Sequence, residues 1–426
     1  MARAFVGDRR GVNDRPLVLG LRPNLGQFVL LAANNALVGT MVGLERTVVP
    51  ILGKDTFHLA SASLLLSFIV SFGVVKGVLN LVAGKLADRW GRKPVLVLGW
   101  LLGIPVPLMV MMAPNWTWIV LANILLGANQ GFAWSMTVSS KVDLVGPKKR
   151  GLALGINEFS GYIGVAITSA FTGYLAAQFG PRPIPFWFGE TVSVAGLLMA
   201  WFAIRETLPF AKLEASSATL SSVPIPGERL ALRQVFARVT YRDRTLFSCS
   251  QAGMVNKFSD TAVWGLVPVL MTGQHFSPAS VGLIGSLYAA VWGVLQLGSG
   301  AWSDRIGRKL PIMVGQWVNG LGVALILMAH SLGMWLVVAA SMGAGTALIY
   351  PVLLSAVGDI SHPAWRSSAL GVYRMWRDGG YAVGGLLLGF GANVFGVARV
   401  LGLLAVLVIL SGVIVMVFMR ETLHRS

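Results

Sequence analysis

Long apolar segments alternate with short polar segments along the whole chain. The apolar segments cover residues 26–51, 61–83, 94–113, 117–140, 152–177, 184–205, 246–272, 276–299, 310–332, 333–356, 369–392 and 398–419. A helix needs about 20 apolar residues to cross the hydrocarbon core of a bilayer, where an open strand would leave its backbone without hydrogen-bond partners. The pattern therefore predicts an all-α polytopic membrane protein with twelve transmembrane helices.

A charged segment occurs twice between these helices. It appears first as Gly84–Lys93 and returns as Gly300–Lys309, an offset of 216 residues. The same offset relates Asp143 to Asp359. The repeat predicts two pseudo-symmetric six-helix bundles related by an axis along the membrane normal.

These boundaries divide the chain into five parts. They are a tail at 1–25, an N-terminal six-helix bundle at 26–205, a linker at 206–245, a C-terminal six-helix bundle at 246–419 and a tail at 420–426. Residues 216–227 are rich in serine and proline, which predicts a flexible connection. After it, arginines interleave with apolar residues from Arg229 to Arg242, which predicts a basic amphipathic helix at the membrane surface. An ordinary polar connector is the alternative.

Composition and charge support the same class. The chain is 55% hydrophobic and only 12% charged, about half the charged fraction of a typical soluble protein. Of its 34 Lys and Arg residues, 26 lie in the tails and in loops on one side, and only four on the other side. Because positive loops stay in the cytoplasm, we expect both termini there, in a bacterial-type plasma (inner) membrane. This placement explains the net charge of +17 better than a nucleic-acid partner does.

Other features narrow the class further. The single cysteine, Cys249, excludes an intramolecular disulfide, and no metal-binding spacing accompanies it. The N-terminus lacks the pattern of a removable signal. We find no phosphate-binding loop and no enzyme motif, and we expect neither a cofactor nor a bound metal. We expect a monomer in the lipid bilayer.

The repeated segment carries a family resemblance. Gly84–Lys93 reads Gly-Lys-Leu-Ala-Asp-Arg-Trp-Gly-Arg-Lys, which matches the loop 2–3 signature of the major facilitator superfamily at every fixed position. Over essentially its whole length the chain resembles a transporter of that family. Many members carry an arginine early in the fourth helix, where this chain has Asn123, and the fifth helix lacks the glycine-proline pair typical of drug antiporters. Both departures weaken the assignment as a multidrug antiporter.

The two charged segments predict a gating motif. Its residues are Gly84, Asp88, Arg89, Gly91, Arg92, Lys93 and Asp143, and Asp304, Arg305, Gly307, Arg308, Lys309 and Asp359. The glycines permit a tight turn, and the basic residues stay at headgroup level. We expect Arg89 or Arg92 to pair with Asp143, and Arg305 or Arg308 to pair with Asp359. The resemblance implies that Asp88 faces the start of the eleventh helix. Topogenic charge alone is the alternative, and it does not explain the aspartates.

Seven charges lie deep inside predicted spans, where each costs about 3 kcal/mol or more without a partner or a cavity. They are Lys76, Lys257, Arg374 and Arg377, and Glu158, Asp260 and Asp378. The depth of Lys76 in the second helix matches that of Asp378 in the eleventh, so we expect a pair. Glu158 and Arg374 are repeat counterparts, which predicts a gate pair that closes when the site opens outward. Alternatively, each binds substrate or a proton separately.

Lys257 and Asp260 stand three residues apart in the seventh helix. They either neutralise each other or contact substrate or a coupling ion. We expect Glu45 and Arg46 to be solvated at the outer interface, although Arg46 is placed to reach Asp260 in an external gate. No histidine lies in mid-membrane, so a coupled proton requires a buried carboxylate, with Glu158 or Asp260 first.

The substrate and coupling candidates are the polar residues expected around a central cavity. They are Lys76, Asn80, Asn129, Gln130, Asn157, Glu158, Asn256, Lys257, Asp260, Gln296, Tyr373, Arg374, Arg377 and Asp378. The four intramembrane cations exceed the three carboxylates, which favours an anionic or zwitterionic cargo. We expect a proton-coupled secondary active transporter that moves a small solute by alternating access of the rocker-switch type. The alternatives are a drug/H⁺ antiporter, a metal or metal-chelate transporter, and a non-transporting membrane receptor or scaffold.

Overall fold

The computed structural model describes residues 17–146, 150–221, 230–362 and 365–423, and every regular element within these ranges is helical. In the first half the elements are α1 (Leu25–Ile51), η1 (Leu52–Thr56), α2 (Ala62–Trp90), α3 (Arg92–Gly103), α4 (Pro105–Met111), α5 (Trp116–Asn129), η2 (Gln130–Trp134), α6 (Ser135–Val145), α7 (Arg150–Phe179), α8 (Ile184–Leu198) and η4 (Met199–Ala203). The elements named η are single π-helical turns that continue the neighbouring helices.

The second half repeats this order after a helical linker. The linker contains α9 (Leu208–Ser221), α10 (Leu232–Ala237) and η5 (Arg238–Arg242). The second half consists of α11 (Arg244–Thr261), η6 (Ala262–Leu266), α12 (Val267–Gly273), α13 (Pro278–Ile306), α14 (Lys309–Ile326), α15 (Leu332–Ile360), α16 (Arg366–Phe395) and α17 (Val397–Phe418). Helix α9 includes Ser216 and Ser217, so the chain is helical in part of the segment that the composition predicts as flexible.

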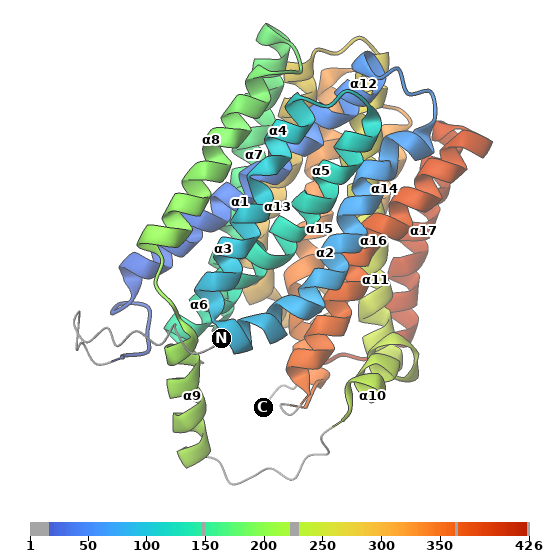
Figure 1. Ribbon diagram of the computed structural model, residues 1–426. Coiled ribbons are helices and arrows are strands. Elements are labelled where there is room, and N and C mark those ends of the chain that lie inside the picture. Colours follow the sequence, from blue (N-terminus) through green and yellow to red (C-terminus); the bar gives the residue numbers. More distant parts are fainter. Residues whose placement is uncertain (1–16, 147–149, 222–229, 363–364, 424–426) are drawn as a thin grey trace.

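Nine helical segments of the described chain are long and apolar enough to cross a membrane. Three further long segments, α7, α11–α12 and α16, run through the same bundle (Figure 1). These three carry most of the charges that the sequence places inside the membrane, which explains why their hydropathy is lower. The predicted all-α polytopic membrane fold is confirmed.

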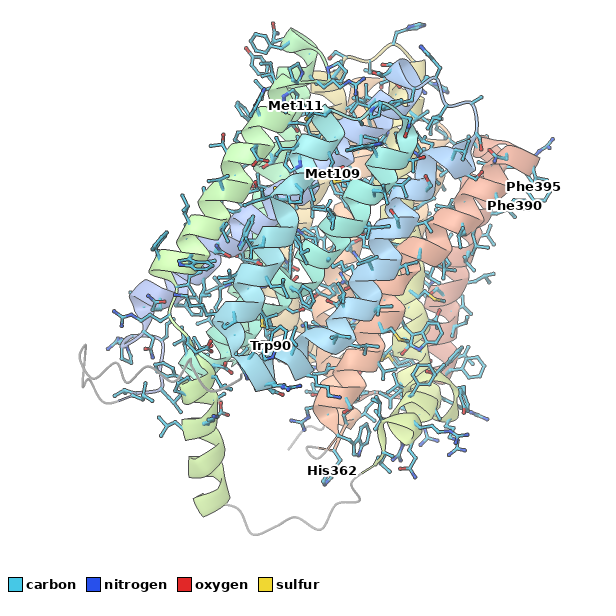
Figure 2. All side chains as sticks on the ribbon, in the orientation of Figure 1. Trp90, Met109, Met111, His362, Phe390 and Phe395 are labelled. Carbon is cyan, nitrogen blue, oxygen red and sulfur yellow. The ribbon has the colours of Figure 1, made fainter. Side chains whose placement is uncertain are left out.

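The two ends of the bundle differ. Trp90 and His362 lie at the end that carries the repeated charged segments, here called the motif end (Figure 2). Met111 and Phe395 lie at the opposite end. Helix α1 begins and helix α17 finishes at the motif end, which is also where α9 and α10 lie (Figure 1).

The halves pack through two long helix pairs, α2 with α16 and α7 with α13. Near the opposite end, α7 and α13 approach so closely that a Cβ on Gly173 would lie 2.7 Å from the carbonyl oxygen of Pro278. A side chain at this position would therefore push the helices apart. The contact holds the two halves together at the opposite end.

The repeated segment is less of a loop than the sequence suggests. Helix α2 continues through Gly84 to Trp90, and the turn is confined to Gly91, whose φ is +100°. Gly307 repeats this conformation with φ +104° between α13 and α14. Only these two glycines of the motif need the left-handed backbone conformation that a residue with a Cβ rarely adopts.

Candidate functional site

The predicted gating motif of the first half is arranged around a buried arginine. Arg92 Nε donates to Asp143 Oδ2 at 2.9 Å, and its Nη1 donates to Asp88 Oδ1 at 2.9 Å. The side chains of Arg92 and Asp143 are only 10% and 11% exposed, whereas that of Asp88 is 75% exposed. Arg92, and not Arg89, is therefore the partner of Asp143. Within the described part of the chain, Asp88 binds Arg92 and forms no hydrogen bond with α16, so the contact implied by the resemblance is not found there.

The second half repeats the arrangement. Arg308 Nε donates to Asp359 Oδ2 at 3.1 Å, and its Nη1 pairs with Asp304 Oδ1 at 2.6 Å. Burial lowers the pKa of Arg308, but the hydrogen bonds to Asp304 and Asp359 outweigh burial and raise that pKa above its ordinary value. The guanidinium therefore stays charged.

Each motif also contains a glutamate, for which the sequence pattern predicted no role. Glu206 accepts the backbone N–H groups of Arg92 and Lys93 at 2.9 and 3.0 Å. It thereby caps the N-terminus of α3, where the helix dipole favours a carboxylate. Glu421 caps α14 in the same way through Arg308 and Lys309.

Burial raises the pKa of Glu421, but the backbone N–H donors outweigh burial and hold it below the ordinary value. The signal for both caps was present in the sequence, because Arg-Glu-Thr-Leu occurs at 205–208 and again at 420–423.

A narrow cavity of about 30 Å³ lies between the two halves at mid-bundle. Its lining comes from α2, η2, α6 and α7 of the first half and from α15 and α16 of the second. The residues are Lys76, Asn80, Trp134, Ser135, Glu158, Tyr162, Tyr350, Arg374, Arg377 and Asp378. Six of the predicted candidates therefore surround one space, here called the central pocket. The cavity admits water, and a solute of several heavy atoms would need the halves to separate.

Asp378 is bound from both sides of the central pocket. Asn80 Nδ2 donates to its Oδ2 at 2.6 Å, and Arg377 Nη1 donates to its Oδ1 at 2.7 Å. Lys76 forms no ion pair with it, and its ammonium group lies 5.4 Å from the ring centres of Phe72 and Trp134. The predicted pair of Lys76 and Asp378 is therefore wrong. The Asp378 carboxylate accepts hydrogen bonds from the Asn80 amide and the Arg377 guanidinium instead.

Glu158 faces the central pocket from α7 without touching Arg374. Its Oε1 accepts from Trp134 Nε1 at 2.9 Å and from Asn157 Nδ2 at 3.3 Å. Lys141, which the hydropathy pattern places in a loop, is fully buried and donates to Asn157 Oδ1. Lys141 thus adds a cation behind Glu158 that the sequence analysis missed.

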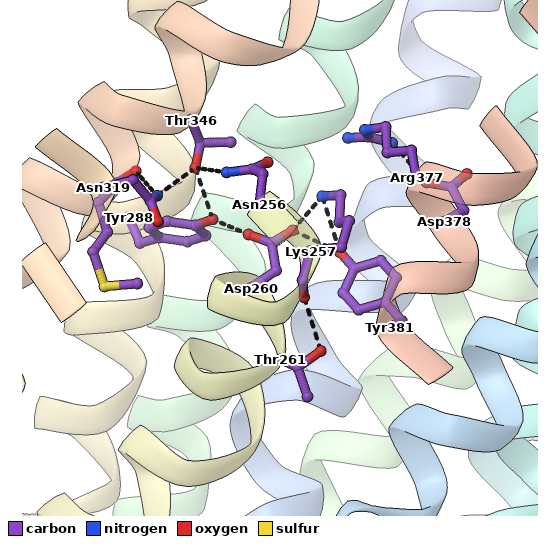
Figure 3. A network of polar contacts seen from close by, with 11 residues as sticks. Asn256, Lys257, Asp260, Thr261, Tyr288, Asn319, Thr346, Arg377, Asp378 and Tyr381 are labelled. Atoms are coloured by element: carbon purple, nitrogen blue, oxygen red, sulfur yellow. Dashed lines mark hydrogen bonds and ion pairs between the residues drawn. The ribbon is translucent and has the colours of Figure 1, made fainter. Parts of the chain in front are cut away.

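A second polar group lies in the C-terminal bundle (Figure 3). Asp260 accepts from Lys257 Nζ and the Tyr288 hydroxyl, and from the Tyr381 hydroxyl at 2.8 Å. We call these four residues the Asp260 cluster. Thr346 Oγ1 lies 3.4 Å from the Tyr288 hydroxyl and extends the cluster toward Asn256 and Asn319. Each member of the cluster except Tyr381 has an exposed fraction of zero.

Glu45 and Arg46 are buried, which contradicts the expected solvation at the interface. Their exposed fractions are 0% and 1%. Asn123 Nδ2 donates to Glu45 Oε2 at 3.2 Å, so the residue at the position of the family arginine binds this carboxylate. The Arg46 guanidinium lies 4.5 Å from the ring centre of Phe72 and 5.5 Å from that of Tyr381, and its nitrogens have no hydrogen-bond partner in the described part of the chain. Arg46 does not contact Asp260 directly.

The remaining candidates lie away from the central pocket. Asn129 Nδ2 donates to the Gly99 carbonyl, and Gln130 Nε2 donates to the Val38 carbonyl, so both tie helices within the first half. Gln296 is buried on α13, and Tyr373 on α16. An asparagine or glutamine in a membrane-spanning segment forms hydrogen bonds between helices as readily as it lines a cavity, so its polarity alone does not identify a binding site.

The halves are also hydrogen-bonded at the opposite end. Asn393 of α16 donates through Nδ2 to Ser61 Oγ at 2.9 Å and to Ser63 Oγ at 2.8 Å, and its Oδ1 accepts the backbone N–H of Ala62 at 2.8 Å. These hydrogen bonds add to the packing of α7 against α13 in joining the halves at the opposite end.

Comparisons with known proteins agree with this architecture. The sequence model of the Major Facilitator Superfamily matches residues 25–256 and 249–426. An uncharacterized MFS-type transporter of Salmonella typhimurium is 22% identical over 394 residues, which cover 89% of this chain and 93% of that protein. Multidrug resistance protein MdtG of Salmonella choleraesuis is 27% identical over 56% of each chain. Multidrug resistance protein 2 of Bacillus subtilis is 26% identical over 42% of this chain and 44% of its own length.

Proposed function

The chain belongs to the major facilitator superfamily of transporters, and we propose that it moves a small anionic or zwitterionic solute by alternating access of the rocker-switch type. The observation that carries this proposal is the central pocket. Both halves contribute charged side chains to it, and it lies between the ends through which a solute would enter and leave. A rocking motion about this pocket would expose it to each side in turn.

The charge of the central pocket supports an acidic cargo. Asp378 is occupied by Arg377 and Asn80, whereas Lys76 and Arg374 have no carboxylate partner among the described residues. Glu158 is the one remaining carboxylate of the lining. The lining thus holds three cations against two carboxylates, so a carboxylate or phosphate on the solute would supply a further negative charge.

Proton coupling is the second part of the proposal. Glu158 faces the central pocket directly, and Asp260 lies deeper in the Asp260 cluster. A carboxylate that gains a proton loses its attraction for a neighbouring cation, which would change the balance between conformations. We propose these two groups as proton carriers and the pair of Glu158 and Arg374 as a gate that closes when the opposite end opens.

The loop charges support an orientation with the motif end and both termini in the cytoplasm of a bacterial-type cell, and we propose that the transporter acts as a monomer. The hydrogen bonds at Asn393 support a conformation that is closed at the opposite end. The structure would then represent a state that opens inward.

A second candidate function is drug/H⁺ antiport. Its support is that two relatives are named multidrug resistance proteins. The absence of an arginine at Asn123 weighs against it.

Transport into proteoliposomes, with and without a pH gradient, tests both functions. The panel contains carboxylates, zwitterions, organic cations and metal ions. We expect uptake of acidic solutes that is lost in Arg374→Gln and retained in Arg399→Gln, an exposed arginine outside the central pocket. Flux of cations that ignores Arg374→Gln would instead support drug antiport, and binding without any flux would support a receptor. Glu158→Gln or Asp260→Asn should abolish the pH dependence, and the coupling proposal is wrong if neither does.

A further inference from the structure

Residues 230–244, which contain α10 and η5, pack against the motif end of the C-terminal bundle. Val235 and Val239, one helical turn apart, are fully buried against the cluster that includes residues of α15 and α16. Trp376 Nε1 donates to Thr240 Oγ1 at 2.9 Å. The Arg238 guanidinium lies 5.5 Å from the ring centre of Trp365. These contacts hold α10 and η5 in one orientation against the bundle.

A cleft of about 390 Å³ opens beside this segment. It is lined by Leu230, Gln234, Arg238, Arg242 and Asp243. The three long polar side chains are spaced by four residues. Four residues slightly exceed one turn of an α-helix, and the wider π turn of η5 compensates for this excess, so the three side chains share one face.

The arginines of the cleft are not neutralised by the protein. Asp243 Oδ1 accepts the backbone N–H groups of Thr245 and Leu246, so its carboxylate caps α11. Among the described residues, Arg238 and Arg242 have no ion-pair partner. Residues 230–244 contain four arginines and one aspartate, a net charge of +3.

The same segment exposes large apolar side chains. Leu232 is 63% exposed and Tyr241 is 64% exposed, and both belong to a helical segment beside the membrane-spanning bundle. A short helical segment that combines exposed apolar side chains with several arginines is typical of a membrane interface. The segment lies at the motif end of the spanning helices, where the headgroups of a bilayer crossed by these helices would lie, and anionic lipids attract basic residues.

We propose that this cleft binds the phosphodiester headgroup of an anionic phospholipid from the leaflet at the motif end. The two guanidinium groups match the oxygens of a phosphodiester in charge and in planar geometry, and the Gln234 amide supplies a further donor. A lipid bound here would tie the linker and the C-terminal bundle to the bilayer. The site does not depend on the proposed cargo or on proton coupling.

Native mass spectrometry of the full chain in detergent, titrated with phosphatidylglycerol, tests the site. The cleft variant is Arg238→Gln with Arg242→Gln. The matched control is Arg233→Gln with Arg244→Gln, which removes the same charge from the same segment but lies outside the cleft. An arginine near an anionic lipid surface contributes about a five-fold gain in affinity, so we expect roughly 25-fold weaker binding in the cleft variant. The control should bind nearly as the wild type does.

Phosphatidylcholine should not be retained, and excess inorganic phosphate should not displace phosphatidylglycerol. The proposal is overturned if both double variants lose affinity equally, because diffuse surface charge then explains binding. Displacement by inorganic phosphate would overturn it in favour of a soluble phosphate, and equal retention of phosphatidylcholine would show that the headgroup is not recognised. Arg242→Gln alone, which leaves the Trp365 contact intact, should weaken binding about five-fold and covers the case in which the double variant does not fold.

Discussion

Removing the hydrogen bonds of Asn393 should open the end of the transporter opposite to the motif end. The Asn393→Ala substitution deletes three hydrogen bonds, of 2.8, 2.8 and 2.9 Å, that join α16 to the start of α2. They connect the two halves, so their loss disfavours only conformations in which this end is closed. Conformations in which the end is open have already lost them.

The expected size follows from the geometry. A hydrogen bond that exchanges with water contributes about 0.5–1.5 kcal/mol, and Asn393 is exposed, so we use the lower part of that range. Three such bonds give about 1.5–3 kcal/mol, which corresponds to roughly a 10- to 100-fold change in the ratio of open to closed molecules.

Pulsed electron–electron double resonance between two spin labels measures the ratio of open to closed molecules. Labels at Leu64→Cys on α2 and Phe390→Cys on α16 use exposed positions of the two helices, in a Cys249→Ser background. The Asn393→Ala variant should gain a longer distance component. Asn115→Ala is the matched control, because Asn115 lies at the same end but caps α5 within the first half.

Two results would refute this reasoning. An unchanged distance distribution in Asn393→Ala would mean that the bonds do not distinguish the conformations. An equal change in Asn115→Ala would mean that any loss of polar contacts at this end loosens the bundle.

The motif end provides three further predictions. Arg92→Met should lower the free energy of unfolding by about 3 kcal/mol, because it leaves Asp143 buried without its cation. The control Arg89→Met, at an exposed position, should lower it by less than about 0.5 kcal/mol. Equal losses in denaturant titrations would contradict the buried pair. Gly91→Ala should lower the free energy of unfolding by about 1–3 kcal/mol, since φ is +100° and the new Cβ would collide with the Glu206 carboxylate. Gly84→Ala, in a helix with open space around the new Cβ, should be neutral or stabilising in the same assay. Because the pKa of Glu421 is lowered in the folded protein, its contribution to stability is complete above pH 4.5 and is lost as the pH falls toward its pKa in the folded state. In Glu421→Gln, a plot of melting temperature against pH should therefore be flatter in this range. An unchanged slope would exclude this role for Glu421.

The repeated charged segments show that sequence spacing alone can identify equivalent ion-pair partners. The offset of 216 residues placed Asp143 and Asp359 at equivalent points, and the structure brings Arg92 and Arg308 to them. Two copies of one arrangement must satisfy the same geometry, so a pair that is equivalent in both halves can be proposed without coordinates. The same argument was available for Glu206 and Glu421, because their four-residue context also repeats.

Depth along a single helix was a weaker guide to partners. Lys76 and Asp378 have matching depths, yet Asp378 binds Asn80 and Arg377. Two groups at one depth meet only if their helices turn the right faces toward each other. Hydropathy failed in a similar way at Glu45, Arg46 and Lys141. These residues stand near predicted span ends, where water is the default, and only the packing of neighbouring helices buries them.

The sequence by itself determined the membrane class, the division into two related bundles and the composition of the gating motif. These properties depend on hydropathy and on chemical identity at fixed spacing, which a linear chain records completely. The tertiary structure decided which charges share the central pocket, which tyrosines surround Asp260, and which polar side chains join the two halves at the opposite end. These outcomes depend on the rotation of each helix and on the position of one bundle against the other. No single segment contains that information, because it arises only when side chains from both halves compete for the same space.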